Sequence, residues 1–208
     1  MTESAKQVII FGGSFSPPTL AHEAIIEQCL KQPEADEVWV MPSGTRLDKD
    51  IQVSDEHRLN MLEAVKRGSF NNNPRLNMSD FELHLPRPSH TARTAGALAL
   101  AHPDTHFWFV FGADSYATMP SWPDGQAMLR ELSMLVVPRA GLAVPAESER
   151  LRILNNDARY QKAISSTAVR RAVAEEASLA ELVSPAVEVY IQTHGLYMTQ
   201  KASQISYT

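Results

Sequence analysis

Hydrophobic residues along the chain form short continuous runs that alternate with amphipathic stretches. The runs predict buried strands at residues 8–11, 37–42, 105–112 and 134–138. The stretches show helical spacing of apolar positions at residues 21–31, 56–68 and 90–102. Strands that alternate with helices are typical of parallel βαβ units. The pattern therefore predicts an α/β fold with a doubly wound parallel sheet.

Further elements follow from weaker patterns. The segment "RLNMSDFEL" at 75–83 predicts another strand, and two helices are expected at 166–177 and 185–193. We expect Gly68 to lie just past the end of the helix that Ser54 or Asp55 begins. Residues 43–54 are polar and predict a loop. We find no repeat or linker, so we expect a single domain over 1–208, with a C-terminal helical part at about 164–198 and a polar tail at 199–208.

Composition narrows the classes of function. The chain has 208 residues and a net charge of −5, which disfavours a polymeric nucleic-acid partner. Its single cysteine, Cys29, excludes an intramolecular disulfide and a cysteine-based zinc site. No apolar run reaches the length of a membrane span, and the N-terminus lacks a signal-peptide pattern. We expect a cytoplasmic protein without a membrane partner, and the sequence leaves a homo-oligomer open.

The loop after the first strand, "GGSFSPPTLAH", carries the first candidate chemistry. Gly12 and Gly13 allow a ligand to approach the backbone closely. Thr19 is placed to cap the next helix, and His22 lies three residues on, on the same face. Backbone N–H groups, a hydroxyl and an imidazole at a helix start form an anion site. The alternative is that Thr19 only caps the helix and His22 is a surface residue.

A second helix start, "ISSTAVRRAVAEEA", has its charges reversed. Ser165, Ser166 and Thr167 are good cap residues. A helix dipole favours acidic residues in the first turn, yet here Arg170 comes early and the glutamates come late. A bound polyanion would explain this arrangement, although a capped helix with solvated arginines is the other reading. Two anion-ready helix starts in one α/β domain favour a phosphate ligand.

These two motifs, in this order and at this distance, resemble the nucleotidyltransferase superfamily. Its signatures are a (H/T)-x-G-H loop and an I-S-S-T-x-x-R helix start, and the likeness is strongest to nicotinate or nicotinamide mononucleotide adenylyltransferases. The segments "SHTARTAGAL" and "FVFGADSYATMPSW" are also similar to parts of that family. The resemblance implies a Rossmann-like nucleotidyltransferase fold. It also implies an enzyme of NAD biosynthesis that moves AMP from ATP to a pyridine mononucleotide and releases pyrophosphate.

The resemblance implies roles for individual residues. His22 and Thr19 would be catalytic, with His22 at the α-phosphate. The residues implied to bind ATP and its phosphates are Gly12, Gly13, Ser14, Phe15, Lys49, Gly112, Asp114, Ile164, Ser165, Ser166 and Arg170. Thr91, Thr94 and Trp122 would bind the mononucleotide. Mg²⁺ would accompany ATP and be held mainly through phosphates, so no dedicated metal ligands are expected.

The sequence departs from the family pattern at three positions. Thr19 stands where mononucleotide enzymes usually carry histidine, Ala21 replaces a glycine, and His90 replaces a tyrosine. Phosphopantetheine adenylyltransferases carry threonine at the first of these, so another phosphate acceptor is one alternative. A non-catalytic ATP- or dinucleotide-binding module is a second. The choice between nicotinate and nicotinamide is open at this point.

Overall fold

The computed structural model describes residues 5–44, 51–88, 90–155, 157, 159 and 164–198, and the described residues include a six-stranded sheet. Its strands run parallel in the order β3-β2-β1-β4-β5-β6. They are β1 (Lys6–Gly13), β2 (Glu37–Pro42), β3 (Leu76–Met78), β4 (Thr105–Gly112), β5 (Ser133–Val137) and β6 (Leu151–Ile153). The strand order reverses between β1 and β4, as in doubly wound sheets. The predicted fold class is confirmed.

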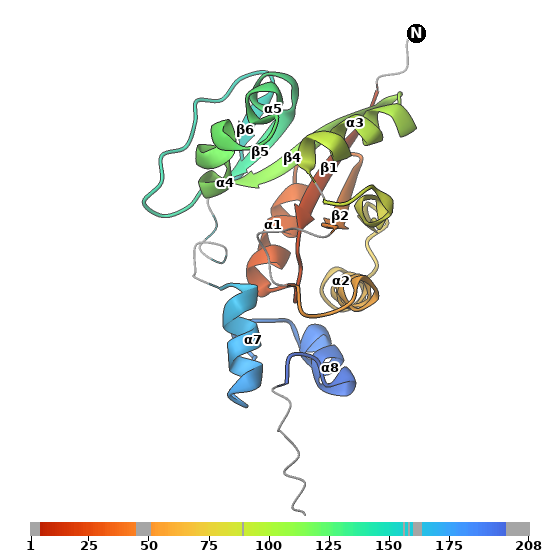
Figure 1. The fold of residues 1–208 in the computed structure, drawn as a ribbon, viewed down its shortest axis with the longest axis vertical. Helices are drawn as coiled ribbons and strands as arrows, with labels where there is room; N and C mark the ends of the chain where they lie inside the picture. The colour runs from red at the N-terminus through yellow and green to blue at the C-terminus, as the bar shows by residue number, and fades with distance from the viewer. Residues whose placement is uncertain are drawn as a thin grey trace, which may run out of the picture.

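Helices connect and cover the strands (Figure 1). The longer ones are α1 (Leu20–Leu30), α2 (Asp55–Phe70), α3 (Thr91–Ala101), α7 (Ser166–Ala174) and α8 (Pro185–His194). Shorter turns are η1 (Phe81–His84), α4 (Ala113–Thr118), η2 (Met119–Ser121) and α5 (Gly125–Glu131). The predicted helices at 21–31, 90–102 and 185–193 match to within a residue or two at each end.

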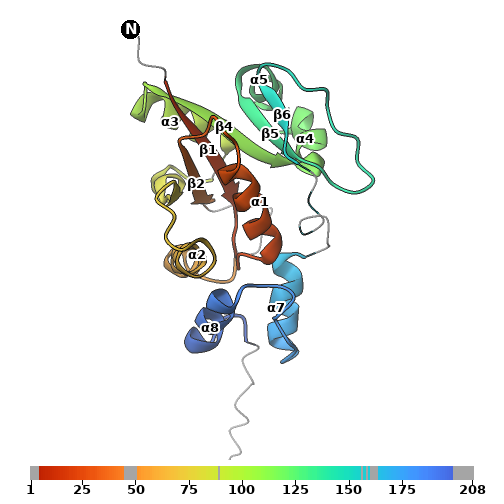
Figure 2. The same ribbon diagram turned by 180° about the vertical axis from the view of Figure 1, so that it is seen from behind.

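Strand β1 shows how the sheet buries both of its faces. Ile9 and Phe11 pack with α1 on one face, whereas Val8 and Ile10 pack with α3 on the other. Successive strand residues point to opposite faces, so a continuous apolar run is what a strand between two helix layers requires. Figures 1 and 2 show α3 and α1 on opposite sides of the sheet.

Some bounds differ from the expectations, and the helix predicted at 166–177 ends at Ala174. Gly68 lies inside α2, which continues to Phe70 and ends at Asn71 in the left-handed conformation. A side chain at position 68 would come within 2.8 Å of Ala186 Cβ, so this glycine allows α8 to approach α2. The strand predicted at 75–83 stops at Met78, because the chain turns into η1, and the edge strand β6 was not predicted.

The C-terminal helices form their own apolar cluster beyond the end of the sheet. Met61 and Val65 of α2 pack there against Val169 of α7 and Ile191 of α8. Both views show α7 and α8 next to each other, below the start of α1 (Figures 1 and 2). The sequence from 166 onward is thereby brought to the loop that follows β1.

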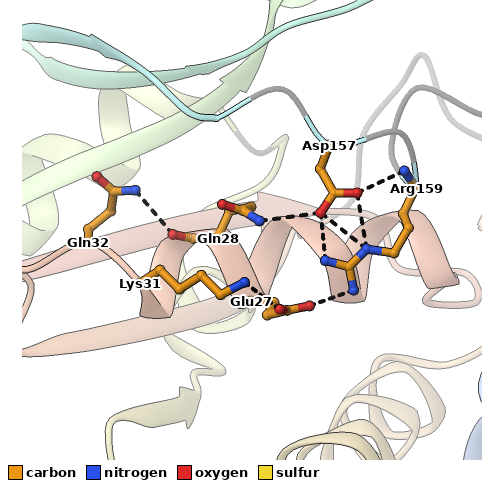
Figure 3. Close-up of polar contacts among 6 residues, drawn as sticks. All are labelled: Glu27, Gln28, Lys31, Gln32, Asp157 and Arg159. Carbon is orange, nitrogen blue, oxygen red and sulfur yellow. Dashed lines mark hydrogen bonds and ion pairs between the residues drawn. The ribbon is translucent and has the colours of Figure 1, made fainter.

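A polar network fastens the chain before α7 to the outer surface of α1 (Figure 3). Arg159 donates to Asp157 and to Glu27 at 2.5 Å each, and Gln28 donates to Asp157 at 3.3 Å. The Arg159 hydrogen bonds hold the pKa of Asp157 well below its usual range. These contacts join α1 to the segment that leads into α7.

Glu23 of α1 gives the fold a predicted pH dependence. The residue is 9% exposed and its Oε1 has no hydrogen-bond partner among the described residues. Burial raises its pKa, against smaller opposing effects of the Ser69 and Ser184 hydroxyls. A raised carboxyl pKa means that the folded state holds the proton more tightly, so stability falls as pH rises through that pKa.

Replacing this buried acid should therefore matter mostly at high pH. Glu23→Gln should raise Tm relative to wild type at pH 8 and have less effect at pH 5, because the amide carries no charge to bury. Thermal unfolding followed by circular dichroism across this range measures the difference. Glu181→Gln at an exposed position is the control. Wild-type and Glu23→Gln curves that stay parallel from pH 5 to pH 8 would contradict the prediction.

Candidate functional site

A cavity of about 390 Å³ opens at the carboxyl ends of β1 and β4. In doubly wound sheets this crevice beside the reversal of strand order is where ligands bind. Six of the residues predicted for the site line it: Gly12, Gly13, Thr91, Thr94, Gly112 and Trp122. The described structure thus brings together residues that the sequence separates by 110 positions.

Thr19 and His22 form a reciprocal cap at the start of α1. The Thr19 hydroxyl accepts from the His22 backbone N–H, and the Thr19 backbone N–H donates to His22 Nδ1 at 3.0 Å. This is a capping box in which histidine takes the place of the usual glutamate or glutamine. The Thr19 side chain is fully buried and lies 2.9 Å from His22 Nδ1. The Thr19 side chain therefore contacts His22 and is not exposed to a ligand.

The protonation state of His22 follows from this cap. Burial, and to a lesser degree the nearby charge of Arg139, lowers the pKa of His22 to about 4. The ring lies against those of Phe15 and Phe11, with centroids 5.1 and 6.0 Å away. Because Nδ1 accepts a backbone hydrogen bond, the hydrogen of the neutral ring sits on Nε2. His22 is thus a neutral N–H donor at physiological pH.

Phe15 lies in the loop between β1 and α1 and shapes it through its backbone and its ring. Its backbone has φ of 45°, which is strained for a residue other than glycine. Its buried ring lies over Gly13, where a Cβ would come within 3.0 Å of Phe15 Cζ. Only the backbone of Phe15 could therefore meet a phosphate. The packing of this ring favours glycine at position 13, and Gly13 also lines the cavity, as ligand clearance would need.

Gly12 does provide clearance. A Cβ there would meet no protein atom within 4 Å, and the residue is exposed at the cavity wall. Gly12→Ala should leave Tm unchanged and raise KM for substrate about three- to tenfold, because the methyl group would occupy ligand space. Steady-state kinetics with thermal unfolding measures both. The matched control is Gly96→Ala on α3, where a Cβ also meets nothing. Unaltered kinetics in Gly12→Ala would place the ligand elsewhere.

The start of α7 is joined to the loop after β1 by side-chain hydrogen bonds. Ser165 caps α7 by accepting from Ala168 N–H. Ser166 Oγ donates to the Pro17 carbonyl at 2.7 Å, and Arg170 donates to the Ser16 carbonyl at 2.8 Å. The two anion-ready helix starts therefore lie together. Their side chains are, however, bound to the protein itself, which the sequence did not indicate.

Asp114 stands at the carboxyl end of β4, in the first turn of α4. Its carboxylate lies 4.0 Å from Arg139 Nε, and both side chains are partly exposed. A Cβ at Gly112 would meet Asp114 Oδ1 at 2.3 Å, so the glycine makes room for this carboxylate. Arg139, which follows β5, places positive charge near both Asp114 and His22. The sequence reading did not single it out.

Thr94 and Trp122, which the sequence analysis assigned to the mononucleotide, both line the cavity. Thr94 is buried, and its Oγ1 lies 3.2 Å from Glu82 Oε2 and 3.3 Å from the His90 carbonyl, so its hydroxyl can donate to either. Glu82 also accepts from the Gly44 backbone N–H. Glu82 was missed because 75–83 was read as a strand. Trp122 meets Phe111 edge to face, with centroids 6.3 Å apart.

Ile164 and Ser14 are not among the residues that line the cavity, and Lys49 cannot be placed. Ile164 packs against the core beside α1, so only its backbone is available. Ser14 offers a backbone carbonyl, to which Arg58 donates at 3.0 Å. Lys49 lies outside the described residues. Arg58 itself was missed, although its spacing from Met61, Leu62 and Val65 places it on the buried stripe of α2.

Two kinds of feature are absent from the described part of the chain. No group of three or more His, Cys, Asp or Glu side chains there is arranged to hold a metal ion. No described helix has the length and apolarity needed to cross a membrane.

Comparisons with known proteins agree on one family. The profile of the family described as cytidylyltransferase-like matches residues 10–172. A protein of Salinibacter ruber named "Probable nicotinate-nucleotide adenylyltransferase" is 34% identical over 194 residues, which cover 90% of this chain and 96% of the relative. A Bacteroides thetaiotaomicron protein of the same name is 32% identical over 204 residues, which cover 93% and 95%.

Solved structures share the fold. The structure described as Plasmodium falciparum nicotinic acid mononucleotide adenylyltransferase complexed with NaAD has a TM-score of 0.78 and 23% identity to this chain. The match covers 92% of this chain and 97% of that one. A structure of the same Plasmodium enzyme complexed with APC matches with a TM-score of 0.77. The Rossmann-like nucleotidyltransferase fold is thereby confirmed.

Proposed function

The chain belongs to the cytidylyltransferase-like family, among the nicotinate-nucleotide adenylyltransferases, and from this premise we propose that its cavity and phosphate loop transfer AMP from ATP to nicotinate mononucleotide. It is a nucleotidyltransferase enzyme. The phosphate loop is the segment 12–19 between β1 and the body of α1. The observation that carries the proposal is the meeting of the α1 and α7 starts at this loop, beside a cavity at the carboxyl ends of β1 and β4.

The reaction needs positioning and charge stabilisation rather than proton transfer. A phosphate oxygen of the mononucleotide attacks the α-phosphorus of ATP. The bond between that phosphorus and the oxygen that links the α- and β-phosphates breaks. Pyrophosphate leaves with the electron pair of that bond. The attacking phosphate is already ionised, so a general base is unnecessary. Catalysis then comes from holding the reactants in line and from donors at the oxygens that gain charge.

His22 is the proposed donor to the α-phosphate. Its Nδ1 is occupied by the Thr19 backbone N–H, so Nε2–H is the group that remains for a ligand. A neutral donor fixed by a capping box needs no rearrangement during the reaction, which is what makes such a donor effective. Thr19 keeps the ring in this orientation.

We propose the remaining contacts to ATP from the positions of the residues in the fold. The N–H groups at the start of α7, with Ser165, Ser166 and Arg170, face the β- and γ-phosphates that leave as pyrophosphate. Asp114 is at the end of β4, where a carboxylate can accept from ribose hydroxyls. Lys49 keeps its predicted role at the phosphates. These roles make α7 and α8 part of one functional unit with the sheet.

The acid form of the pyridine ring is favoured by α3. This helix begins at the cavity, where His90 and Thr91 contribute to the lining. The side chain of its N-cap residue, His90, makes no capping hydrogen bond, and no acidic residue lies in its first turn. An anionic carboxylate suits such a helix start better than a neutral amide does. We therefore propose nicotinate as the base, stacked on Trp122 and close to Thr94.

Mg²⁺ fits this site as an ion that arrives with ATP. The described residues provide no metal cage, and Mg²⁺ commonly binds through substrate phosphates and water. When bound it would neutralise charge on the phosphates. The charged substrates suggest a cytoplasmic enzyme, and a homo-oligomer is compatible with the proposal.

A substrate panel tests the function. Purified protein with ATP and Mg²⁺ should release pyrophosphate when nicotinate mononucleotide is added. The kcat/KM for nicotinamide mononucleotide should be lower, and phosphopantetheine should give no turnover. Chromatography of the dinucleotide product confirms the acceptor. Tight ATP binding without turnover on any acceptor would instead identify a binding module and overturn the proposal.

A further inference from the structure

Three backbone carbonyls of the phosphate loop are held by donors from other helices. The Ser14 carbonyl accepts from Arg58 of α2 at 3.0 Å. The Ser16 and Pro17 carbonyls accept from Arg170 and Ser166 of α7. A carbonyl oxygen repels a phosphate, whereas a peptide N–H attracts one. The hydrogen bonds from α2 and α7 offset the negative ends of these carbonyls and fix the direction of their peptide groups.

Arg58 is costly to the fold and has no role in the function described so far. Its side chain is fully buried, and among the described residues it forms an ion pair with Asp55, 2.6 Å away. Its Nε is buried without a hydrogen-bond partner in the described structure. A buried charge with incomplete bonding lowers stability unless something offsets it. Its second guanidinium contact, to Ser14, points to the phosphate loop as the reason for its presence.

Tyr197 supports the same loop from the C-terminal end of the described chain. Its hydroxyl lies 3.2 Å from Ser16 Oγ. Burial raises the pKa of Tyr197 to about 12, so the hydroxyl keeps its proton, and Arg58 and Arg170 are both near enough to affect it. The loop is therefore held by α2, by α7 and by the segment after α8.

We propose that Arg58 and Tyr197 are positioning residues that fix the phosphate loop in its triphosphate-binding conformation. Arg58 does so through the Ser14 carbonyl and Tyr197 through the Ser16 hydroxyl. This rests on the proposed function, since it assigns the loop to ATP. Neither residue lines the cavity, so they act on ATP through the loop and have no direct effect on the mononucleotide.

The test separates the two substrates. Arg58→Lys keeps the charge but loses the two-pronged contact to Ser14 and Asp55. It should lower kcat/KM for ATP about ten- to a hundredfold, as expected for a misplaced reacting group. The Kd for nicotinate mononucleotide alone, from calorimetry, should stay within about twofold of wild type. Arg67→Lys, at an exposed position of the same helix, is the matched control and should change neither.

Tyr197→Phe is the second variant and keeps the ring in place. It should raise KM for ATP about threefold and leave mononucleotide binding unchanged. If Arg58→Lys does not fold, the kinetics of Tyr197→Phe alone test the positioning role. Wild-type kinetics in the folded variants would overturn the proposal. A Kd for nicotinate mononucleotide that weakens as much as kcat/KM for ATP falls would also overturn it, because that indicates general damage to the fold. If wild type binds ATP without turnover, the proposed function fails, and the Kd for ATP of the variants still tests the positioning role.

Discussion

Replacement of His22 by alanine is expected to lower kcat about a hundredfold or more, with a much smaller change in KM for either substrate. The loss of one preorganised donor to developing charge has effects of about this size. His22 is such a donor because its neutral ring is fixed by the Thr19 backbone N–H and is set between Phe11 and Phe15. Initial rates of pyrophosphate release measure the effect.

Two controls make the His22 result specific. His84→Ala, at an exposed histidine of η1, should leave kcat unchanged. The pKa of His22 is about 4 in the unliganded protein, and kcat/KM reports the ionisations of the free enzyme. We therefore expect wild type and His22→Ala to show the same dependence of kcat/KM on pH between pH 6 and pH 9. A kcat/KM that titrates near pH 6.5 in wild type and not in the variant would show that His22 works as a cation, contrary to the prediction.

Replacement of Trp122 by alanine is expected to raise KM for nicotinate mononucleotide about tenfold to a hundredfold. Stacking of a base on an aromatic ring contributes about 1–3 kcal/mol. Trp122 lies in the cavity wall and is held edge to face by Phe111, so its ring is already placed before the ligand arrives. The KM for ATP should change less than threefold, because the phosphate loop is not involved.

The conservative variant tests stacking itself. Trp122→Phe keeps an aromatic surface and should fall between wild type and Trp122→Ala in KM. Trp39→Phe is the control, since Trp39 is outside the cavity and donates to Glu37. If Trp122→Ala raises KM for both substrates equally, the tryptophan serves to pack the short helices α4 and α5 and is not a stacking surface.

Periodicity predicted the sheet well because its central strands are buried on both faces. Strands β2 and β4 have the predicted bounds, and β1 extends the predicted run by two residues at each end. The hydrophobic pattern was insufficient where contacts between distant elements determine the bounds of a helix or strand. Gly68 has the signature of a helix end, yet it is used for the close approach of α8. The edge strand β6 has three residues and a central arginine, so no apolar run marks it.

The location of the site could be predicted from the sequence, but the hydrogen-bond partners of its side chains could not. Cap residues and reversed charges identified the starts of α1 and α7, and the structure joins them. That Ser166 and Arg170 bond to carbonyls of the phosphate loop depends on contacts across about 150 positions, which no local pattern encodes. Arg58 did leave a signal, because a charged residue at a core position of an amphipathic helix calls for a polar partner.

The contact between Ser16 and Tyr197 spans 181 positions of the chain, and this has a consequence for synthesis. A ribosome adds roughly 5–20 residues per second, so about 10 to 40 s pass between the two. The phosphate loop is therefore synthesised well before Tyr197, and until then it lacks this support. A nascent chain stalled before α7 carries β1 but not Ser166, Arg170 or Tyr197, so three of the contacts that hold the phosphate loop are missing.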